Sequence, residues 1–537
     1  MTKQHRLPVP GVHMSDRELQ ETLPAQRSAF RSPIPTQVVS NGEYNPLPQT
    51  MKQQQVEGLI KELADEQGAR LKLDRRRFLA TSAGMAMAFV AMNKVFGPIF
   101  AVTEAEARDL DVAAERAKGL SGQFIFDVQT HFVHDGFDKE GMLGGAKWLS
   151  EVGANPDLLK SMPLTLARFK FENYVKEMFL DSDTTVALLS GAPGDDPTWW
   201  FLSNDNIKQA VDAINKVAGS RRMAGHFVIT PKYPNWMDEV DRAIETLSPA
   251  SWKAYTLGAP FFPPSNFAWR LDDEKLMYPF YQKALKAGIN TICIHKGIMP
   301  NDYEAAFPGT WRHATPDDVG KAAKDWPQMN FVIYHSAIRP FGANTPDQEM
   351  AEFDQKGYIR WVTDLARIPQ QYGVSNVYAE IGTTFASTCV TNPRFCAAVL
   401  GQLVHMMGAD HVVWGTDSVF WGSPQWQIEA MRRIEIPEDM LKTHKWKPLG
   451  GPNSPTKQAI FGLNSARLYN YDTGRAQGPA FAADKLAVIK REYQQQGIER
   501  TNAYYGYSLM RPLRCGRSLP RLRNCSAPIM TRCNYPT

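Results

Sequence analysis

The amino-acid sequence predicts an α/β protein built on a parallel (β/α)8 TIM barrel. Short apolar runs typical of strands recur eight times between residues 121 and 415, and longer segments with helical spacing separate them. A doubly wound sheet needs fewer repeats and usually a Gly-rich phosphate turn, but neither a G-x-G-x-x-G nor a Walker motif is present. The predicted strands are residues 124–132, 185–189, 223–228, 252–255, 291–295, 331–335, 377–380 and 412–415.

The segments between these strands supply the helical half of the pattern. Apolar residues recur at helical spacing, and Gly, Pro or Asn stands near the segment ends. The predicted helices are residues 206–218, 237–247, 274–287, 316–326, 357–369 and 394–408. We therefore expect one barrel domain over residues 121–507.

Composition excludes several classes of protein. The 537 residues are 43% hydrophobic and 22% charged, which is typical of a globular chain, and the net charge of +4 gives no reason to expect nucleic acid as a partner. The basic excess lies in residues 508–537, which hold six arginines and no acid. This end also carries three cysteines. It is either a basic disordered tail or a divergent or frame-shifted end of the reading frame.

The N-terminal region divides into two parts. Residues 1–73 are rich in Gln, Pro, Thr and Ser, so we expect a flexible extension with one helical stretch at residues 51–73. Residues 74–107 then resemble a twin-arginine translocation signal. They contain Arg75 and Arg76, an uncharged run over residues 78–93, and a small-x-small site ending at Ala107.

The signal-like segment predicts export. Its uncharged run has 16 residues, fewer than the ~20 that a membrane-spanning helix needs, so we expect cleavage rather than a stable membrane span. The expected partner is the twin-arginine translocation machinery and the expected location is the periplasm, with the cytoplasm as the alternative. A second interpretation is a helix docked on the body of the protein, in which the paired arginines are coincidental.

Polar residues recur where the predicted strands end. In barrels of this kind the active site lies at the C-terminal ends of the strands, so side chains at these positions converge on one pocket. Each residue alone is more often a hydrogen-bonded core residue, but their recurrence at one end indicates a site. The candidates are Gln129, His131, Lys253, His295, His335, Glu380 and Asp417.

Five motifs at these positions resemble the metal-dependent amidohydrolase superfamily. The similarity is to the amidohydrolase-2 group, which includes aminocarboxymuconate-semialdehyde decarboxylase. The motifs are Asp127-Val128-Gln129-Thr130-His131, Ile294-His295, Tyr334-His335, Trp414-Gly415-Thr416-Asp417-Ser418 and the closing stretch IFGLNSARLY at residues 460–469.

The resemblance implies one divalent metal ion, either zinc or manganese. It implies His131, His295 and Asp417 as metal ligands, with His335 and Asp417 as catalytic acid or base. The chain departs from the family at Gln129, where His or Glu is usual. An amide oxygen is a weaker ligand than either, so Gln129 is expected as a weak fourth ligand or a neighbouring donor.

Other residues have two interpretations each. His134 replaces the missing imidazole if its loop bends towards the metal. Lys253 is either a contact for an anionic substrate or an ion-pair partner, for instance of Glu380. Glu380 is a structural acid or orients another group. Trp421 and the tryptophans at 199, 200, 269 and 426 either line the rim for a flat substrate or pack the long loops.

Two reactions suit such a site. We expect a metal-dependent hydrolase that acts on a small cyclic or aromatic ester, lactone or amide. The alternative is nonoxidative decarboxylation of an aromatic or unsaturated carboxylic acid at the same site. A further alternative is an inactive binding protein, because Gln129 weakens the metal site. A homo-oligomer is compatible with all three.

Overall fold

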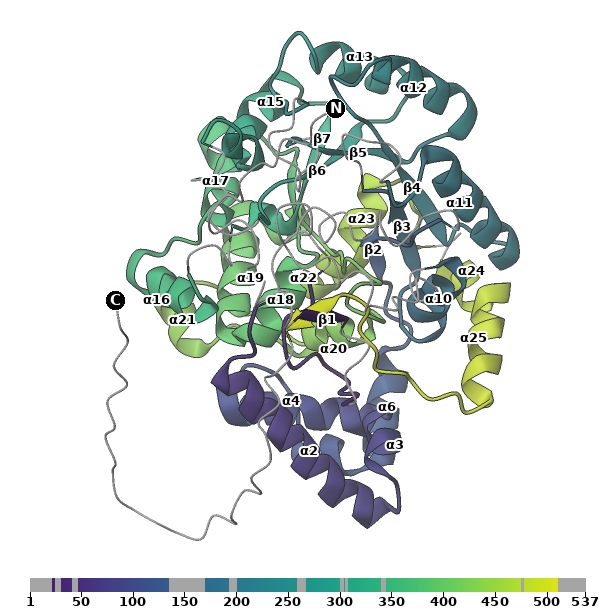
Figure 1. The fold of residues 1–537 in the computed structure, drawn as a ribbon, viewed down its shortest axis with the longest axis vertical. Coiled ribbons are helices and arrows are strands. Elements are labelled where there is room, and N and C mark those ends of the chain that lie inside the picture. Colours follow the sequence, from purple (N-terminus) through teal and green to yellow (C-terminus); the bar gives the residue numbers. More distant parts are fainter. Residues whose placement is uncertain are drawn as a thin grey trace, which may run out of the picture.

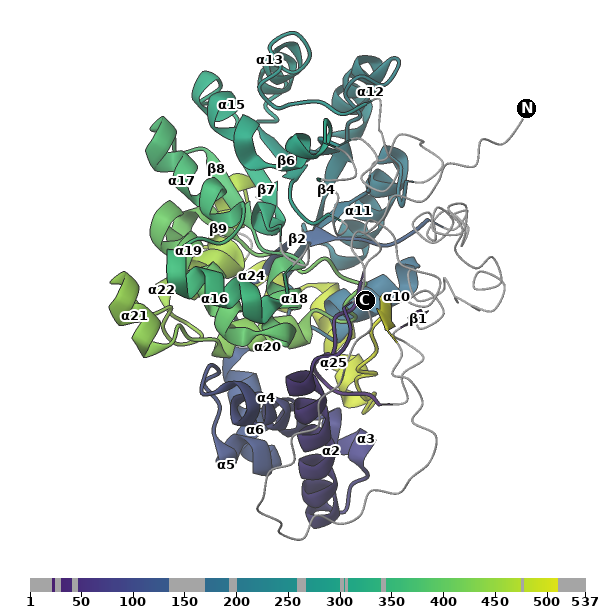
Figure 2. The same cartoon turned by 60° about the vertical axis from the view of Figure 1, so that its left-hand side comes forward.

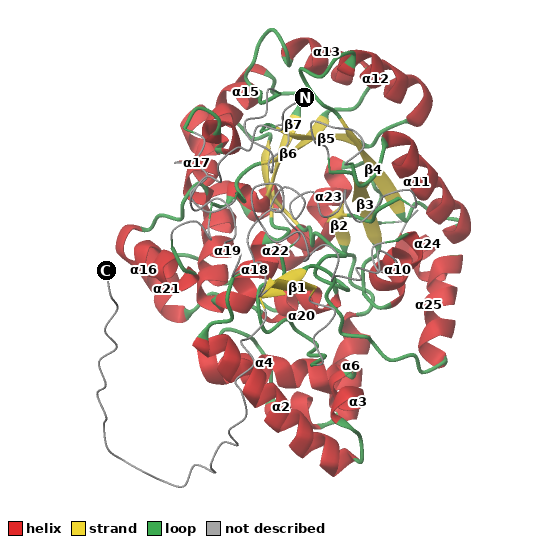
Figure 3. Cartoon of the chain, viewed as in Figure 1, coloured by secondary structure: helices red, strands yellow, loops and turns green. Residues whose placement is uncertain are grey.

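Eight parallel strands form a ring at the centre of the molecule (Figures 1 and 3), which confirms the predicted fold class. The computed structural model describes residues 22–24, 30–40, 47–134, 170–192, 200–257, 267–299, 304, 308–339, 344–474 and 478–509. The strands pair in chain order: β2 (Phe126–Thr130), β3 (Val186–Ser190), β4 (Met223–Val228), β5 (Ser251–Tyr255), β6 (Thr291–His295), β7 (Asn330–Tyr334), β8 (Val377–Glu380) and β9 (Val412–Val413).

Backbone hydrogen bonds join the first strand to the segment after the last. The N–H of Val128 donates to the carbonyl of Trp414 at 2.9 Å, and the N–H of Asp417 donates to the carbonyl of Gln129 at 2.9 Å. The N–H of His131 donates to the carbonyl of Ser418 at 2.7 Å. These bonds hold the two segments that carry Gln129, His131 and Asp417 side by side.

Helices surround the ring, and most occupy the predicted segments (Figure 3). Capping residues explain several boundaries. Ser203 forms a capping box with Asn206 at the start of α11, and Gly219 ends the helix at φ 73°. The helices over this part are α11 (Asn204–Ala218), α12 (Trp236–Arg242), α13 (Tyr278–Lys286), α15 (Val319–Asp325), α16 (Pro346–Lys356), α17 (Val362–Tyr372), α18 (Thr384–Thr391), α19 (Pro393–Met407), α20 (Gln425–Arg433), α21 (Glu438–His444), α22 (Pro455–Gln458) and α23 (Asn464–Leu468).

Three further helices lie before β3 and after the barrel. A short helix, α10 (Phe171–Val175), precedes β3, and α24 (Gly478–Ala483) and α25 (Lys485–Gln495) follow the barrel. Strand β1 (Thr22–Pro24) pairs antiparallel with β10 (Tyr507–Leu509). The predicted tail falls outside the described residues from 510 onward. No described helix combines the length and apolar character that crossing a membrane requires.

The N-terminal region forms a group of helices on one side of the barrel (purple and blue in Figures 1 and 2). They are α2 (Met51–Leu71), α3 (Arg75–Leu79), α4 (Ser82–Phe96), α5 (Glu104–Arg108) and α6 (Leu110–Leu120). Helix α2 occupies the stretch predicted to be helical.

The signal-like segment lies inside this group as helix α4. Every residue from Ala83 to Met92 is buried. The twin arginine is at the surface nearby, where Arg75 pairs with Asp65 and the neighbouring Arg77 lies 3.2 Å from Glu499. The structure thus places the segment as a docked helix. Cleavage after Ala107 would take α4 out of this core.

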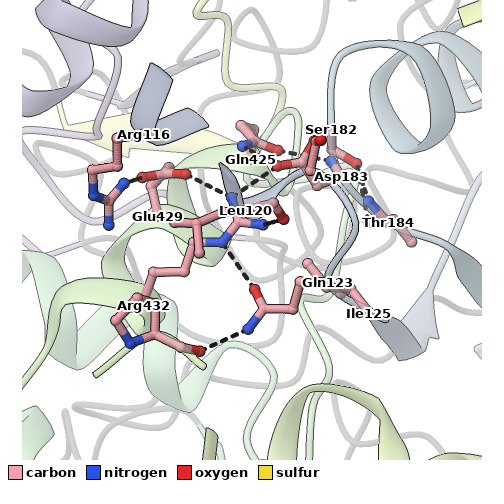
Figure 4. Close-up of polar contacts among 12 residues, drawn as sticks. Arg116, Leu120, Gln123, Ile125, Ser182, Asp183, Thr184, Gln425, Glu429 and Arg432 are labelled. Atoms are coloured by element: carbon pink, nitrogen blue, oxygen red, sulfur yellow. Dashed lines mark hydrogen bonds and ion pairs between the residues drawn. The ribbon is translucent and has the colours of Figure 1, made fainter. Parts of the chain in front are cut away.

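Ion pairs link the N-terminal helices to the barrel (Figure 4). Glu429 of α20 accepts from Arg432 at 2.7 Å, from Arg116 of α6 at 2.9 Å, and also from Arg433. Arg433 reaches Glu106 of α5, and Arg432 reaches Asp183, just before β3, at 2.8 Å. We call Glu106, Arg116, Asp183, Glu429, Arg432 and Arg433 the docking network.

Candidate active site

Five of the predicted polar residues meet at the C-terminal end of the barrel. Gln129 and His131 come from β2 and the residues after it, His295 ends β6, His335 follows β7, and Asp417 follows β9. All five are buried. We call this set the mouth cluster.

His131 and Asp417 are in direct contact. The Nε2 atom of His131 lies 3.2 Å from Oδ1 of Asp417. The Nδ1 atom of His131 lies 2.7 Å from the carbonyl oxygen of Ser190. A carbonyl oxygen can only accept, so Nδ1 carries the proton and Nε2 of the neutral ring presents a lone pair to the carboxylate. This arrangement needs either a second proton on His131 or a cation between the two groups.

Gln129 joins Asp417 to His335. Its Nε2 atom lies 3.2 Å from Oδ1 of Asp417 and 3.4 Å from Nε2 of His335. Its Oε1 atom is buried and has no hydrogen-bond partner among the described residues. A half-satisfied buried amide is costly, because the unmade bond is not replaced by water. Rotation of the amide would turn this oxygen towards the cluster.

His335 is held by its surroundings in one tautomer. Its Nδ1 atom lies 2.9 Å from the carbonyl oxygen of Gly382, so Nδ1 is the donor and Nε2 faces Gln129. The backbone N–H of His335 donates to Oε2 of Glu380 at 3.0 Å. Burial raises the pKa of Glu380 to about 8, despite that bond and another from the N–H of Gly382. Glu380 therefore fixes the backbone that carries His335.

His295 lies beside His335, with ring centres 4.7 Å apart, and stacks on Tyr255 at 4.4 Å. Burial, and then the positive charge of Lys253, lower the pKa of His295 to about 3, so its ring is neutral. The Lys253 ammonium is buried in the barrel, 3.3 Å from the ring centre of Tyr334 and 5.3 Å from that of Tyr255. Strand β5 thus adds the cation of Lys253 to the site, and strand β6 adds the imidazole of His295.

Trp421 is fully buried, and its indole N–H donates to the hydroxyl of Thr383 at 3.4 Å. Trp269 and Trp426 are also buried, and their N–H groups donate to backbone carbonyls. The contacts of Trp269 and Trp426 are those of packing, whereas Trp421 also reaches Thr383, beside the mouth cluster. Trp200 is half-buried. The predicted rim residue at position 199 and most of segment 261–269 lie outside the described residues.

His134 lies away from these contacts. It lines a pocket with Phe132, Phe171 and Gln209, and its backbone N–H donates to the carbonyl of Phe201 at 3.1 Å. In the described contacts, the imidazoles next to Asp417 and Gln129 are those of His131 and His335.

Two residues of the site were not among the sequence candidates. Asp127 accepts from the backbone N–H groups of Gln129 and Thr416, each at 3.1 Å, and from the Thr416 hydroxyl. Burial raises the pKa of Asp127 to about 7, against these hydrogen bonds. Thr383 donates to Oδ2 of Asp417 at 2.5 Å. Asp127 stood in the first motif and could have been chosen. Nothing in the local sequence marked Thr383.

The donor types in the mouth cluster fit a divalent cation. Histidines that bind metals usually donate their other ring N–H to a carbonyl or carboxylate, as His131 and His335 do here. Asp417 offers an oxygen and Gln129 has an oxygen without a partner. Within the described residues, however, no group of three or more His, Cys, Asp or Glu side chains is placed so that it could hold a metal ion as it stands. The chemistry of the donors therefore fits, and closing the shell requires side-chain rotation.

Comparison with known proteins identifies the family. The family model described as Amidohydrolase matches residues 188–471, which is more than half of the chain. The chain belongs to the amidohydrolase family. The matched part includes His295, His335 and Asp417, whereas Gln129 and His131 precede it. No curated protein matches this amidohydrolase.

Several solved structures are similar to this amidohydrolase at low identity. An uncharacterised TIM-barrel protein from Bordetella bronchiseptica has 14% identity and a TM-score of 0.40, covering 65% of this chain and 98% of that one. A 5-carboxyvanillate decarboxylase from Novosphingobium aromaticivorans with bound manganese has 13% identity and a TM-score of 0.38, covering 66% and 98%. A dihydroxybenzoic acid decarboxylase from Polaromonas, also with manganese, has 13% identity and a TM-score of 0.40, covering 66% and 99%.

Proposed function

We propose that this amidohydrolase is a divalent-metal-dependent enzyme that removes the carboxyl group of a small aromatic or unsaturated acid without oxidation. The observation that carries the proposal is the contact between Nε2 of His131 and Oδ1 of Asp417, which lie 3.2 Å apart and need a second proton on His131 or a cation between them. We propose His131, His295 and Asp417 as ligands of one zinc or manganese ion, with Gln129 as a weak fourth. When bound, such an ion polarises the oxygens of the substrate.

Lys253 supports an anionic substrate. Its buried ammonium is close enough to the histidines to lower the pKa of His295 by its charge. A carboxylate that enters this site gains from that charge in a low-dielectric surrounding, whereas a neutral ester or lactone does not. We therefore propose Lys253 as an anchor for the substrate carboxylate, which favours decarboxylation over the hydrolysis of neutral substrates.

The groups around Asp417 also favour this reaction. Hydrolysis needs a base that takes a proton from water, and the resemblance offers Asp417 and His335 for this role. The Oδ2 atom of Asp417 accepts from Thr383 and its Oδ1 faces His131 and Gln129, so both oxygens are engaged. We propose that Asp417 binds metal, and that His335 takes up a second proton on Nε2 from solvent, delivers it to the substrate and returns to the neutral ring. The carbon–carboxyl bond breaks, carbon dioxide leaves, and the carbon takes that proton.

The experiment is a carbon dioxide release assay with a panel of aromatic and unsaturated carboxylic acids, run beside an ester and lactone panel. We expect release of carbon dioxide from at least one acid by metal-loaded protein and loss of release in His335→Asn. The control is Lys442→Ala, because Lys442 forms an exposed ion pair with Glu438. Hydrolysis without carbon dioxide would contradict the proposal in favour of a hydrolase. Metal binding with neither activity, or no metal binding, would favour a binding protein.

A further inference from the structure

Thr383 has a backbone conformation that its side chain disfavours. It lies in the turn between β8 and α18 with φ 51° and ψ −41°. A positive φ is rare for residues other than glycine, and for a β-branched residue it is an outlier. Such strain persists where the surrounding structure imposes it, often at functional sites. The position of its hydroxyl gives a reason for keeping threonine there.

The hydroxyl of Thr383 stands between two fixed groups. The indole N–H of Trp421 donates to it at 3.4 Å, and an indole can only donate. The hydroxyl proton is then directed to Oδ2 of Asp417, at 2.5 Å. Both Thr383 and Trp421 are fully buried, so water does not compete for these bonds. The chain from Trp421 through Thr383 to Asp417 therefore runs in one direction.

Asp417 needs such a restraint. Its own φ is 56°, and it follows the short strand β9 by four residues. Its Oδ1 atom faces His131 and Gln129, while Oδ2 is turned to Thr383. A hydrogen bond to one oxygen fixes the plane of the carboxylate and so decides which lone pairs of the other oxygen point into the cluster.

We propose that Thr383 is a positioning residue that orients the carboxylate of Asp417, with Trp421 orienting Thr383 in turn. The proposal rests on the proposed function insofar as Asp417 is a metal ligand. Its geometric part, the orientation of Asp417, stands without any metal. The role belongs to the hydroxyl group and not to the size of the side chain. Substitutions that change only one of these two properties therefore distinguish them.

The test compares Thr383→Val with Thr383→Ser. Valine keeps the shape and the β-branch but removes the donor, whereas serine keeps the donor and removes the branch. We expect manganese affinity, measured by titration of metal-stripped protein, to fall about 10–100-fold in Thr383→Val and to stay within about threefold in Thr383→Ser. Thr391→Val is the matched control, because the Thr391 hydroxyl donates to the carbonyl of Ser387 within α18. It should leave the affinity unchanged.

Crystal structures of the metal-free variants supply the second readout. We expect the Asp417 carboxylate to rotate in Thr383→Val and to keep its orientation in Thr383→Ser. Loss of orientation in both variants, or in neither, would overturn the proposal. If the parent protein binds no manganese, the metal function fails, and the structures alone then decide whether Thr383 positions Asp417.

Discussion

The docking network and the mouth cluster are both buried and polar, yet they are built in opposite ways. In the docking network, arginines alternate with carboxylates. Glu429 lies against Arg116 and Arg432, and Arg432 reaches Asp183 (Figure 4). Arg433 also contacts Glu429 and reaches Glu106. Among the described contacts of the mouth cluster, no arginine faces the carboxylate of Asp417, which contacts His131, Gln129 and Thr383 instead.

Backbone strain follows the same division. His335, Ser336, Ala337, Thr383 and Asp417 all have positive φ and lie in or beside the mouth cluster, whereas none of the docking residues does. Compensated charges on relaxed helices hold two parts of a chain together. Polar side chains that converge on a strained backbone are typical of a ligand-binding site. The comparison separates stability from function in this amidohydrolase, and each prediction below tests one side of it.

The largest effect is expected from removing residues 1–107. Helix α4 buries Met85, Met87, Phe89, Val90 and Met92. At ~1.5–3 kcal/mol for each side chain, these contribute about 7–15 kcal/mol. That equals the whole stability of a typical protein, ~5–15 kcal/mol. We expect the truncated chain to be insoluble or unfolded by circular dichroism. A soluble, folded protein that begins after Ala107 would show that the docked helices are dispensable and would favour a cleaved signal.

The next effect is expected at Glu429. In Glu429→Gln the buried Arg432 and Arg433 and the half-buried Arg116 lose their shared carboxylate, and breaking a buried pair in this way costs about 3–5 kcal/mol. Urea denaturation measures this loss. Glu438→Gln is the matched control, because its ion pair with Lys442 is exposed and is expected to contribute about 0–1 kcal/mol. Equal free energies of unfolding of the two variants would show that the docking network does not stabilise the fold.

Asp417→Asn tests the other region. We expect manganese affinity to fall by at least about 100-fold, because an amide replaces a charged ligand. The free energy of unfolding of the metal-free protein should change by less than about 1 kcal/mol, since the amide oxygen of asparagine can still accept from Thr383 while its NH2 group donates to Nε2 of His131. A loss of stability as large as that of Glu429→Gln, with metal affinity unchanged, would make the mouth cluster structural as well.

The smallest effect is a dependence of stability on pH. Burial alone would raise the pKa of Glu429, but the charges of Arg433, Arg432 and Arg116 outweigh it and the pKa is lowered. A lowered pKa in the folded state stabilises the protein above the unfolded value of ~4.3, and this stabilisation is lost as pH falls below it. Each such group contributes a slope of about 1.4 kcal/mol per pH unit. Denaturation curves between pH 3 and 7 should show a shallower slope in Glu429→Gln than in the parent. Identical slopes in the parent and the variant would contradict the lowered pKa of Glu429.

Much of the fold could be predicted from the sequence because strand and helix periods alternate regularly. The ends of the strands and helices were harder to predict from the sequence. The strand expected at 331–335 ends at Tyr334, since His335 turns into a left-handed conformation set by contacts with Gly382 and Glu380. The run at residues 78–93 has the composition of a signal, but composition alone does not show which other segments of the chain a helix packs against. Its place in the structure depends on contacts far along the chain, such as those of α20.

The site shows the same limit. The converging histidines and Asp417 could be chosen because barrel strands end in them. Thr383 could not be chosen, because its role arises from the distance between two loops and from a backbone angle that no local pattern encodes. The sequence leaves the tryptophans either at the rim or in packing, and in the structure Trp269, Trp421 and Trp426 are buried.

The central claim, that the mouth cluster holds a divalent ion, is tested most directly by anomalous diffraction from crystals soaked in manganese. We predict one strong peak among His131, His295 and Asp417, with the side-chain oxygen of Gln129 turned towards it, and no peak in Asp417→Asn crystals. Absence of a peak at the cluster in the parent protein, with the contact between His131 and Asp417 unchanged, would contradict the claim and leave a protonated His131 as the partner of Asp417.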